Sequence, residues 1–220
     1  MRYYPLFLDI EDRHCLVVGG GKVGTRKVEA LLDCGAAVTV ISPRVSDRLA
    51  ELAKQGKIVL KMRDYRDTDI DDAFIVFGAT DNKALNQQLH RQCADGHRLC
   101  NIADHPEGCS FVVPSVMRQG DLSIAVSTAG KSPALARHLR LELERLFGPE
   151  YGALLELLGA VRARLLEGEH APERHKALFE QLIGSDVLEM LRQKDHQGVN
   201  ALLNQVLGPG FDVQDLLESP

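Results

Sequence analysis

Short apolar runs separated by amphipathic stretches fill the first half of the chain, a pattern that predicts strands alternating with helices. The runs at 15–18, 37–41 and 73–79 are almost wholly apolar, as in strands buried on both faces of a sheet. The stretches at 25–33 and 82–93 have helical spacing. Further elements are expected as strands at 58–61 and 99–103, a helix at 45–55, and a lead-in strand or cover at 4–9.

This order of elements predicts an α/β fold with a Rossmann-like doubly wound parallel sheet. Crossover connections between parallel strands are right-handed, and such sheets bind a dinucleotide across the carboxyl ends of their strands. The expected boundary of this domain is residue 113.

The pattern changes at Pro114. Residues 115–126 read as two strands joined across Gln119–Gly120–Asp121, and Ser132 followed by Pro133 is typical of a helix start. Beyond 150 the apolar positions recur with helical spacing only. We therefore expect a small α+β segment at 114–150 and a helical domain at 151–220.

The loop after the first strand has the glycine spacing of a dinucleotide-binding turn. Gly19, Gly21 and Gly24 fit G-x-G-x-x-G and lead into a helix. We expect Gly19 to allow the tight turn, Gly21 to admit a pyrophosphate to bare backbone, and Gly24 to let the helix pack closely on the strand. Lys22 and Val23 open the helix, and no hydroxyl follows Lys22 to hold Mg²⁺ as in a Walker A loop.

One part of the dinucleotide fingerprint is missing. The second strand of such folds usually ends in a carboxylate that binds the ribose of NAD, but here it runs into Ser42, Pro43 and Arg44. Ser42 can serve the ribose, and Arg44 can pair with a 2′-phosphate or lie over the adenine; a surface arginine in a turn is an equal alternative. The choice between NAD and NADP stays open.

Asp104 follows directly after the fifth expected strand, at the edge where these folds bind ligands. A carboxylate there can act as a general base, while the alternative is a cap for the turn before Pro106. His105 can carry a proton or simply lie exposed in the turn.

A second candidate is the locally basic helix that begins near Thr128. Lys131 and Arg137 lie at or after a helix N-terminus, which suits a polyanionic small molecule. The alternative is a solvated helix face with i,i+4 pairs such as His138–Glu142.

Composition excludes several classes of protein. The charge of −5 argues against nucleic-acid binding, and no apolar run approaches the length of a membrane span or a signal peptide. Five cysteines without a C-x-x-C pair suit a reducing cytoplasm and give no metal site.

The motifs together resemble the precorrin-2 dehydrogenase family, which also forms the N-terminal part of siroheme synthase. They cover about the first 150 residues, and the blocks at 110–115 and 125–133 are the most specific. The matching blocks are YPLFL at 4–8, VVGGGKVG at 17–24 with Arg26–Lys27, FGATD at 77–81, CNIAD at 100–104, SFVVPS at 110–115, and AVSTAGKSP at 125–133 with Ala136–Arg137.

The resemblance implies an enzyme that oxidises precorrin-2 to sirohydrochlorin with NAD as hydride acceptor. It also implies a homodimer formed through the segment at 114–150. It places the functional aspartate at Asp104. The nucleotide contacts it implies are Gly21, Lys22, Val23, Gly24, Pro43, Arg44, Thr80 and Asp81, to which the glycine motif adds Gly19. Our candidates for substrate binding are Ser115, Thr128, Lys131, Ser132 and Arg137.

Two departures from the family pattern matter. The sequence ends at 220, before the methyltransferase half of fused siroheme synthases, so no S-adenosylmethionine role is expected. Thr128 stands where some fused members have serine. Alternatives are a bifunctional enzyme that also inserts Fe²⁺ or Co²⁺, using Asp104 with His105 or His138, and a non-catalytic NAD(H)-sensing module.

Overall fold

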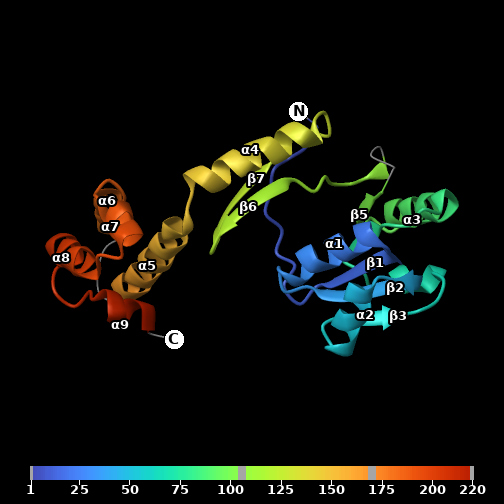
Figure 1. Cartoon of the computed structure of the whole chain (residues 1–220), viewed down its shortest axis with the longest axis horizontal. Coiled ribbons are helices and arrows are strands. Elements are labelled where there is room, and N and C mark those ends of the chain that lie inside the picture. Colours follow the sequence, from blue (N-terminus) through green and yellow to red (C-terminus); the bar gives the residue numbers. More distant parts are fainter. Residues whose placement is uncertain (1, 104–107, 168–171, 219–220) are drawn as a thin grey trace. The chain divides into compact units, whose positions relative to one another are not determined.

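The computed structural model describes residues 2–103, 108–167 and 172–218 (Figure 1). It divides into two compact units, Met1–Val113 and Pro114–Pro220. The second boundary predicted from the sequence, after residue 150, falls near the start of helix α5 (Pro149–Leu166). The three-domain division stays a prediction.

The first unit is a five-stranded parallel sheet with strand order β3-β2-β1-β4-β5. The chain runs outward from the central β1 in one direction and then in the other, which confirms the predicted Rossmann-like fold. The strands are β1 (His14–Gly20), β2 (Ala37–Val45), β3 (Val59–Lys61), β4 (Ile75–Gly78) and β5 (Leu99–Ile102). The helices are α1 (Lys22–Leu32), α2 (Asp47–Lys54) and α3 (Lys83–Asp95), with a 3₁₀ turn η1 (Asp67–Ile70).

Alternation along β1 supplies both faces of the core. Val17 packs with Val28 of α1 and Leu49 of α2 on one face, while Leu16 packs with Leu89 of α3 on the other. All five side chains are fully buried. Each burial of this kind contributes roughly 1.5–3 kcal/mol, which explains why the strand is continuously apolar.

Two segments differ from the sequence expectation. Residues 2–10 form neither strand nor helix, so the strand, one of the two forms expected for 4–9, is wrong. Tyr4 and Phe7 are 85% and 75% exposed. Strand β2 continues to Val45, four residues beyond the expected end. It does so because Gly20 pairs with Val45 after a register shift between Val18 and Gly20, a pairing that no local pattern announces.

The second unit begins with the expected hairpin of β6 (Ser115–Gln119) and β7 (Leu122–Val126). Gly120, at φ +55°, takes the first position of its two-residue turn. Helix α4 (Pro133–Leu146) packs on both strands.

The rest of the second unit is helical, as the spacing predicts. Buried leucines and valines of α5 and of the four helices that follow it form its core, among them Leu157, Leu182, Val187, Leu203 and Val213. No helix in the described ranges is long and apolar enough to cross a membrane. After α5 come α6 (Pro172–Ile183), α7 (Val187–Gln193), α8 (His196–Leu207) and α9 (Val213–Glu218).

A buried carboxylate holds the connection between β3 and β4. Asp69, whose side chain is 5% exposed, accepts hydrogen bonds from Arg63 at 2.6 and 2.7 Å and from the Arg66 backbone N–H at 2.9 Å. Lys61 Nζ lies 3.6 Å away. The Arg63 hydrogen bonds are the main cause that lowers the pKa of Asp69 to about 2, against the opposing effect of burial.

Because the pKa of Asp69 is depressed in the folded state, its contribution to stability is present above about pH 4 and is lost as the pH falls toward 2. We expect Asp69→Asn to lower the free energy of unfolding by about 1–2 kcal/mol at pH 7, with a difference that shrinks progressively below pH 4. Urea unfolding at pH 7, 5 and 3 measures it. Asp64 is an exposed neighbour, so Asp64→Asn is the control and should change the free energy of unfolding little. If Asp69→Asn lost the same free energy of unfolding at pH 7 and at pH 3, the proposed link between the pKa of Asp69 and stability would be contradicted.

Candidate functional site

The turn after β1 leaves no room for a Cβ at Gly19, Gly20 or Gly24. Gly19 has φ +117°, and a Cβ there would lie 2.2 Å from the carbonyl oxygen of Ala79. A Cβ on Gly24 would lie 2.1 Å from the carbonyl oxygen of Gly19. The start of α1 is therefore pressed against the end of β1, next to the chain that leaves β4.

The N-terminus of α1 has no side-chain cap. Gly21 is the N-cap residue and makes no side-chain cap hydrogen bond, and the first backbone bond back to it comes from Thr25 N–H at 2.9 Å. The N–H groups of residues 22–24 thus lack intrahelical partners. A Cβ on Gly21 would meet nothing within 4 Å, and Lys22 and Val23 are exposed. This open, donor-rich backbone fits the pyrophosphate of a dinucleotide.

The end of β2 lies against the same loop. A Cβ on Gly20 would come within 2.5 Å of the carbonyl oxygen of Arg44, and Ser46 N–H donates to Gly20 O at 2.9 Å. Ser46 caps α2 through Leu49 N–H at 3.3 Å, and its hydroxyl also shares a 2.8 Å hydrogen bond with Thr25. Pro43 and Arg44 are exposed beside the glycine loop.

The loops after β4 and β5 are joined by Asn86, a residue that the motif search missed. Its amide nitrogen donates to Thr80 O at 2.9 Å and to Ala103 O at 3.4 Å, and the residue is 5% exposed. Thr80 also accepts from Asn82 N–H at 3.0 Å, and Asn82 caps α3. The available signal was a polar residue on the apolar face of α3, three positions before Leu89.

Asp104 and His105 lie outside the described residues, and their roles stay predictions. Ala103, directly before them, donates its N–H to Gly78 O at 2.7 Å. Cys109 Sγ accepts a hydrogen bond from Ile102 N–H at 3.2 Å.

Lys27 is a second residue whose place the sequence did not reveal. Its Nζ lies 5.1 Å from the ring centroid of Phe77, and that ring meets Phe111 edge-on at 5.7 Å. Burial, followed by repulsion from Arg26, lowers the pKa of Lys27. The cation is stabilised by an aromatic face at the carboxyl end of β4.

The expected polyanion residues lie in the second unit, most of them at one end of the hairpin. Ser115 pairs with Val126, so the loop from 127 starts beside it. Thr128 Oγ1 donates to Ser132 O at 3.0 Å and accepts from Ser132 N–H at 3.1 Å, and Ser132 caps α4 through Leu135 N–H at 3.2 Å. The Thr128 hydroxyl therefore joins the two ends of the loop at 128–132.

Two positively charged side chains lie near the N-terminus of α4. Lys131 and Arg137 are exposed and make no ion pair within the described ranges. Arg140 pairs with Glu144, and His138 lies 3.3 Å from Glu142 as the spacing predicts.

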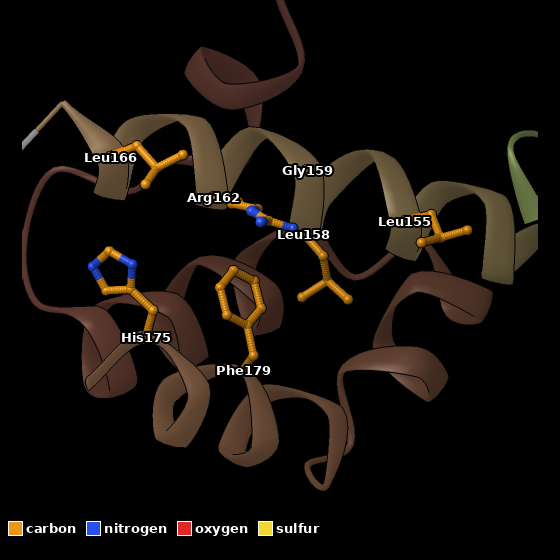
Figure 2. Close-up of a pocket in the computed structure, with 7 residues that line it drawn as sticks. All are labelled: Leu155, Leu158, Gly159, Arg162, Leu166, His175 and Phe179. Carbon is orange, nitrogen blue, oxygen red and sulfur yellow. The ribbon is translucent and has the colours of Figure 1, made fainter. Parts of the chain in front are cut away.

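A separate apolar cavity of about 420 Å³ lies between α5 and α6 (Figure 2). None of the residues predicted to form a site lines it. In the described part of the chain no three His, Cys, Asp or Glu side chains are grouped to hold a metal ion. The cavity is lined by Leu155, Leu158, Gly159, Arg162, Leu166, His175 and Phe179.

The structure thus brings together the predicted nucleotide residues of the first unit, at the carboxyl ends of β1, β2 and β4. It also brings together Ser115, Thr128, Lys131 and Ser132 in the second unit, with Arg137 one turn further along α4. The assignment of these residues to ligands stays a prediction.

Comparison with protein families gives two matches. Residues 6–115, half of the chain, match the family described as "Putative NAD(P)-binding". Residues 119–146 match the family described as "Sirohaem biosynthesis protein central".

Curated relatives and a known structure agree with these matches. Siroheme synthases of Nitrosococcus oceani and Methylobacillus flagellatus are 35% and 36% identical over 96% and 86% of this chain. The chain spans less than half of their length, 45% and 41%. The structure of SirC, a precorrin-2 dehydrogenase, has a TM-score of 0.78 and 26% identity, covering 93% of this chain and 98% of that one. The chain therefore belongs to the NAD(P)-binding family of siroheme biosynthesis proteins that includes precorrin-2 dehydrogenase.

Proposed function

We propose that this chain oxidises precorrin-2 to sirohydrochlorin with NAD. The observation that carries the proposal is the uncapped glycine start of α1 at the point where the sheet order reverses, in a chain that resembles a precorrin-2 dehydrogenase over nearly its whole length. This likeness to an enzyme favours a dehydrogenase over a nucleotide-sensing module.

The chain's residues would bind and orient the dinucleotide. The free N–H groups of residues 22–24 would hold the pyrophosphate, and the exposed Pro43 and Arg44 would flank the adenosine. Thr80 and Asp81 follow β4, where the nicotinamide half lies in folds of this order. When bound, NAD supplies the hydride acceptor.

Asp104 would take the proton that leaves as the hydride departs. The substrate loses one hydride and one proton, so a single base balances the oxidation. A carboxylate two positions after the last residue of β5 suits that role.

The acid arms of the tetrapyrrole call for cations and backbone donors. Lys131 and Arg137 are exposed and unpaired within the described ranges, beside the N-terminus of α4 with its Ser132 cap and the neighbouring Ser115 and Thr128. Metal insertion, the alternative built on Asp104 and His105, gains no support from the described residues and stays a prediction.

A homodimer is also part of the proposal. Leu135, Leu139 and Leu146 of α4 are 48%, 36% and 67% exposed and recur at positions that share one helix face. An apolar stripe of this kind is typical of a surface covered by another subunit. All five cysteines lie in the described ranges without a disulfide, which suits a cytoplasmic location.

Gly21→Ala tests the nucleotide site. The new Cβ meets no protein atom, so the fold should be kept, but it fills the space proposed for the pyrophosphate. We expect the affinity for NAD, measured by calorimetry, to fall about tenfold or more with the melting temperature unchanged; about 1.4 kcal/mol is one factor of ten. Gly159→Ala on α5, also free of clashes, is the matched control. Unchanged NAD binding in Gly21→Ala would contradict the site.

Asp104→Asn tests the base. Loss of a general base should reduce the rate of precorrin-2 oxidation by roughly 10²–10⁴-fold while NAD binding is retained. Appearance of the sirohydrochlorin spectrum reports the rate, and Asp95→Asn, an exposed carboxylate on α3, should react like the unmodified protein. Normal turnover in Asp104→Asn would remove the assignment.

Leu139→Asp tests the dimer. A charge inside the apolar stripe should convert the protein to a monomer in light-scattering chromatography, since burying an unpaired carboxylate is costly. Leu141→Asp is a control of equal chemistry, because Leu141 is 37% exposed on the opposite side of α4. If both variants behave like the unmodified chain, the interface lies elsewhere.

A further inference from the structure

The end of β2 lacks the group that rejects a 2′-phosphate. In dinucleotide-binding folds that select NAD, a carboxylate at this place accepts a hydrogen bond from the ribose 2′-hydroxyl and repels the extra phosphate of NADP. Residues 42–46 here are Ser, Pro, Arg, Val and Ser. No negative charge stands at the position that decides this selectivity.

Ser42 does not replace the missing carboxylate. It is 8% exposed, and its hydroxyl donates to the carbonyl oxygen of Arg44 at 2.6 Å. The donor of this hydroxyl is therefore used inside the protein, and the side chain is largely covered from the ligand side. Of the two groups that the sequence offered for the ribose, the structure favours Arg44.

The backbone of Arg44 is fixed beside the nucleotide loop. Its carbonyl oxygen fills the space where a Cβ of Gly20 would lie, at 2.5 Å, and the next residue, Val45, pairs with Gly20. Ser46 N–H donates to Gly20 O at 2.9 Å on the other side. Strand pairing thus sets the distance between Arg44 and the glycine turn.

The Arg44 side chain is available to a ligand. It is exposed, and within the described ranges it makes neither an ion pair nor a side-chain hydrogen bond. Arg48, the second residue of α2, differs because its Nε lies 2.9 Å from Glu29 Oε1. Asp47 is the nearest acidic residue in sequence and does not pair with Arg44. A guanidinium without a partner at this site can form a bidentate pair with a phosphate.

We propose that the nucleotide site of this chain accepts NADP as well as NAD, and that Arg44 is the specificity-determining residue that pairs with the 2′-phosphate. The proposal rests on the nucleotide site of the proposed function, but not on the identity of the substrate that is oxidised.

Equilibrium calorimetry with NAD and NADP, without tetrapyrrole, tests it. The unmodified protein should bind the two nucleotides with dissociation constants within about threefold of each other. Arg44→Ala should weaken the binding of NADP by about tenfold or more, or about 1.4 kcal/mol. The same change should weaken the binding of NAD by less than about threefold. Arg48→Ala, an exposed arginine that pairs with Glu29, is the matched control and should leave the NADP to NAD ratio unchanged.

Two further measurements sharpen the result. Arg44→Asp should lower the affinity for NADP relative to NAD further than Arg44→Ala does, because a carboxylate repels the phosphate. Raising NaCl from 50 to 300 mM should weaken the binding of NADP more than the binding of NAD in the unmodified protein. In Arg44→Ala the same salt change should weaken the binding of both nucleotides by similar factors. Thermal melts verify that each variant is folded.

Three outcomes would overturn the proposal: NAD binding without NADP binding in the unmodified protein, an equal loss of both nucleotides in Arg44→Ala, or the same change of ratio in Arg48→Ala. Binding of neither nucleotide would overturn the proposed function as well. Normal nucleotide binding without precorrin-2 oxidation would contradict only the proposed function.

Discussion

The close contact between the end of β1 and the start of α1 is the constraint on which the first unit depends. At Gly24 the two backbones leave no room for a Cβ, so the helix begins directly at the edge of the sheet. This position directs its unpaired N–H groups to the carboxyl ends of the strands, where the neighbouring loops also arrive. A helix displaced by a single methyl group would no longer present them there.

Polar side chains then fix the loops around that edge. The Thr25–Ser46 hydrogen bond joins the loop after β1 to the loop after β2, and Asn86 joins the loops after β4 and β5. The amide nitrogen of Asn86 makes both bonds and so ties the two loops to the same helix. Its buried Oδ1 has no hydrogen-bond partner among the described residues. Side chains at the starts of the helices and on α3 therefore fix the positions of the loops that form the candidate site.

Much of this could be predicted from local patterns. The strand–glycine–helix order, the hairpin at 115–126 and the Ser132 cap follow from residue spacing, and the structure contains them. The extension of β2 to Val45, the bonds of Asn86 and the aromatic contact of Lys27 depend on partners that are far away in sequence, so no local pattern reveals them. Residues 4–9 show the opposite case: of the two forms expected there, a lead-in strand or a cover, the strand is not formed, because a strand needs a neighbour to pair with.

The loop that precedes α4 shows which part of a side chain is under constraint. Both hydrogen bonds of Thr128 to Ser132 use the hydroxyl oxygen, and neither involves the methyl group. Serine supplies the same oxygen, so a serine here would keep both hydrogen bonds and leave the loop closed. Valine, which matches threonine in shape, lacks that oxygen and would lose both bonds.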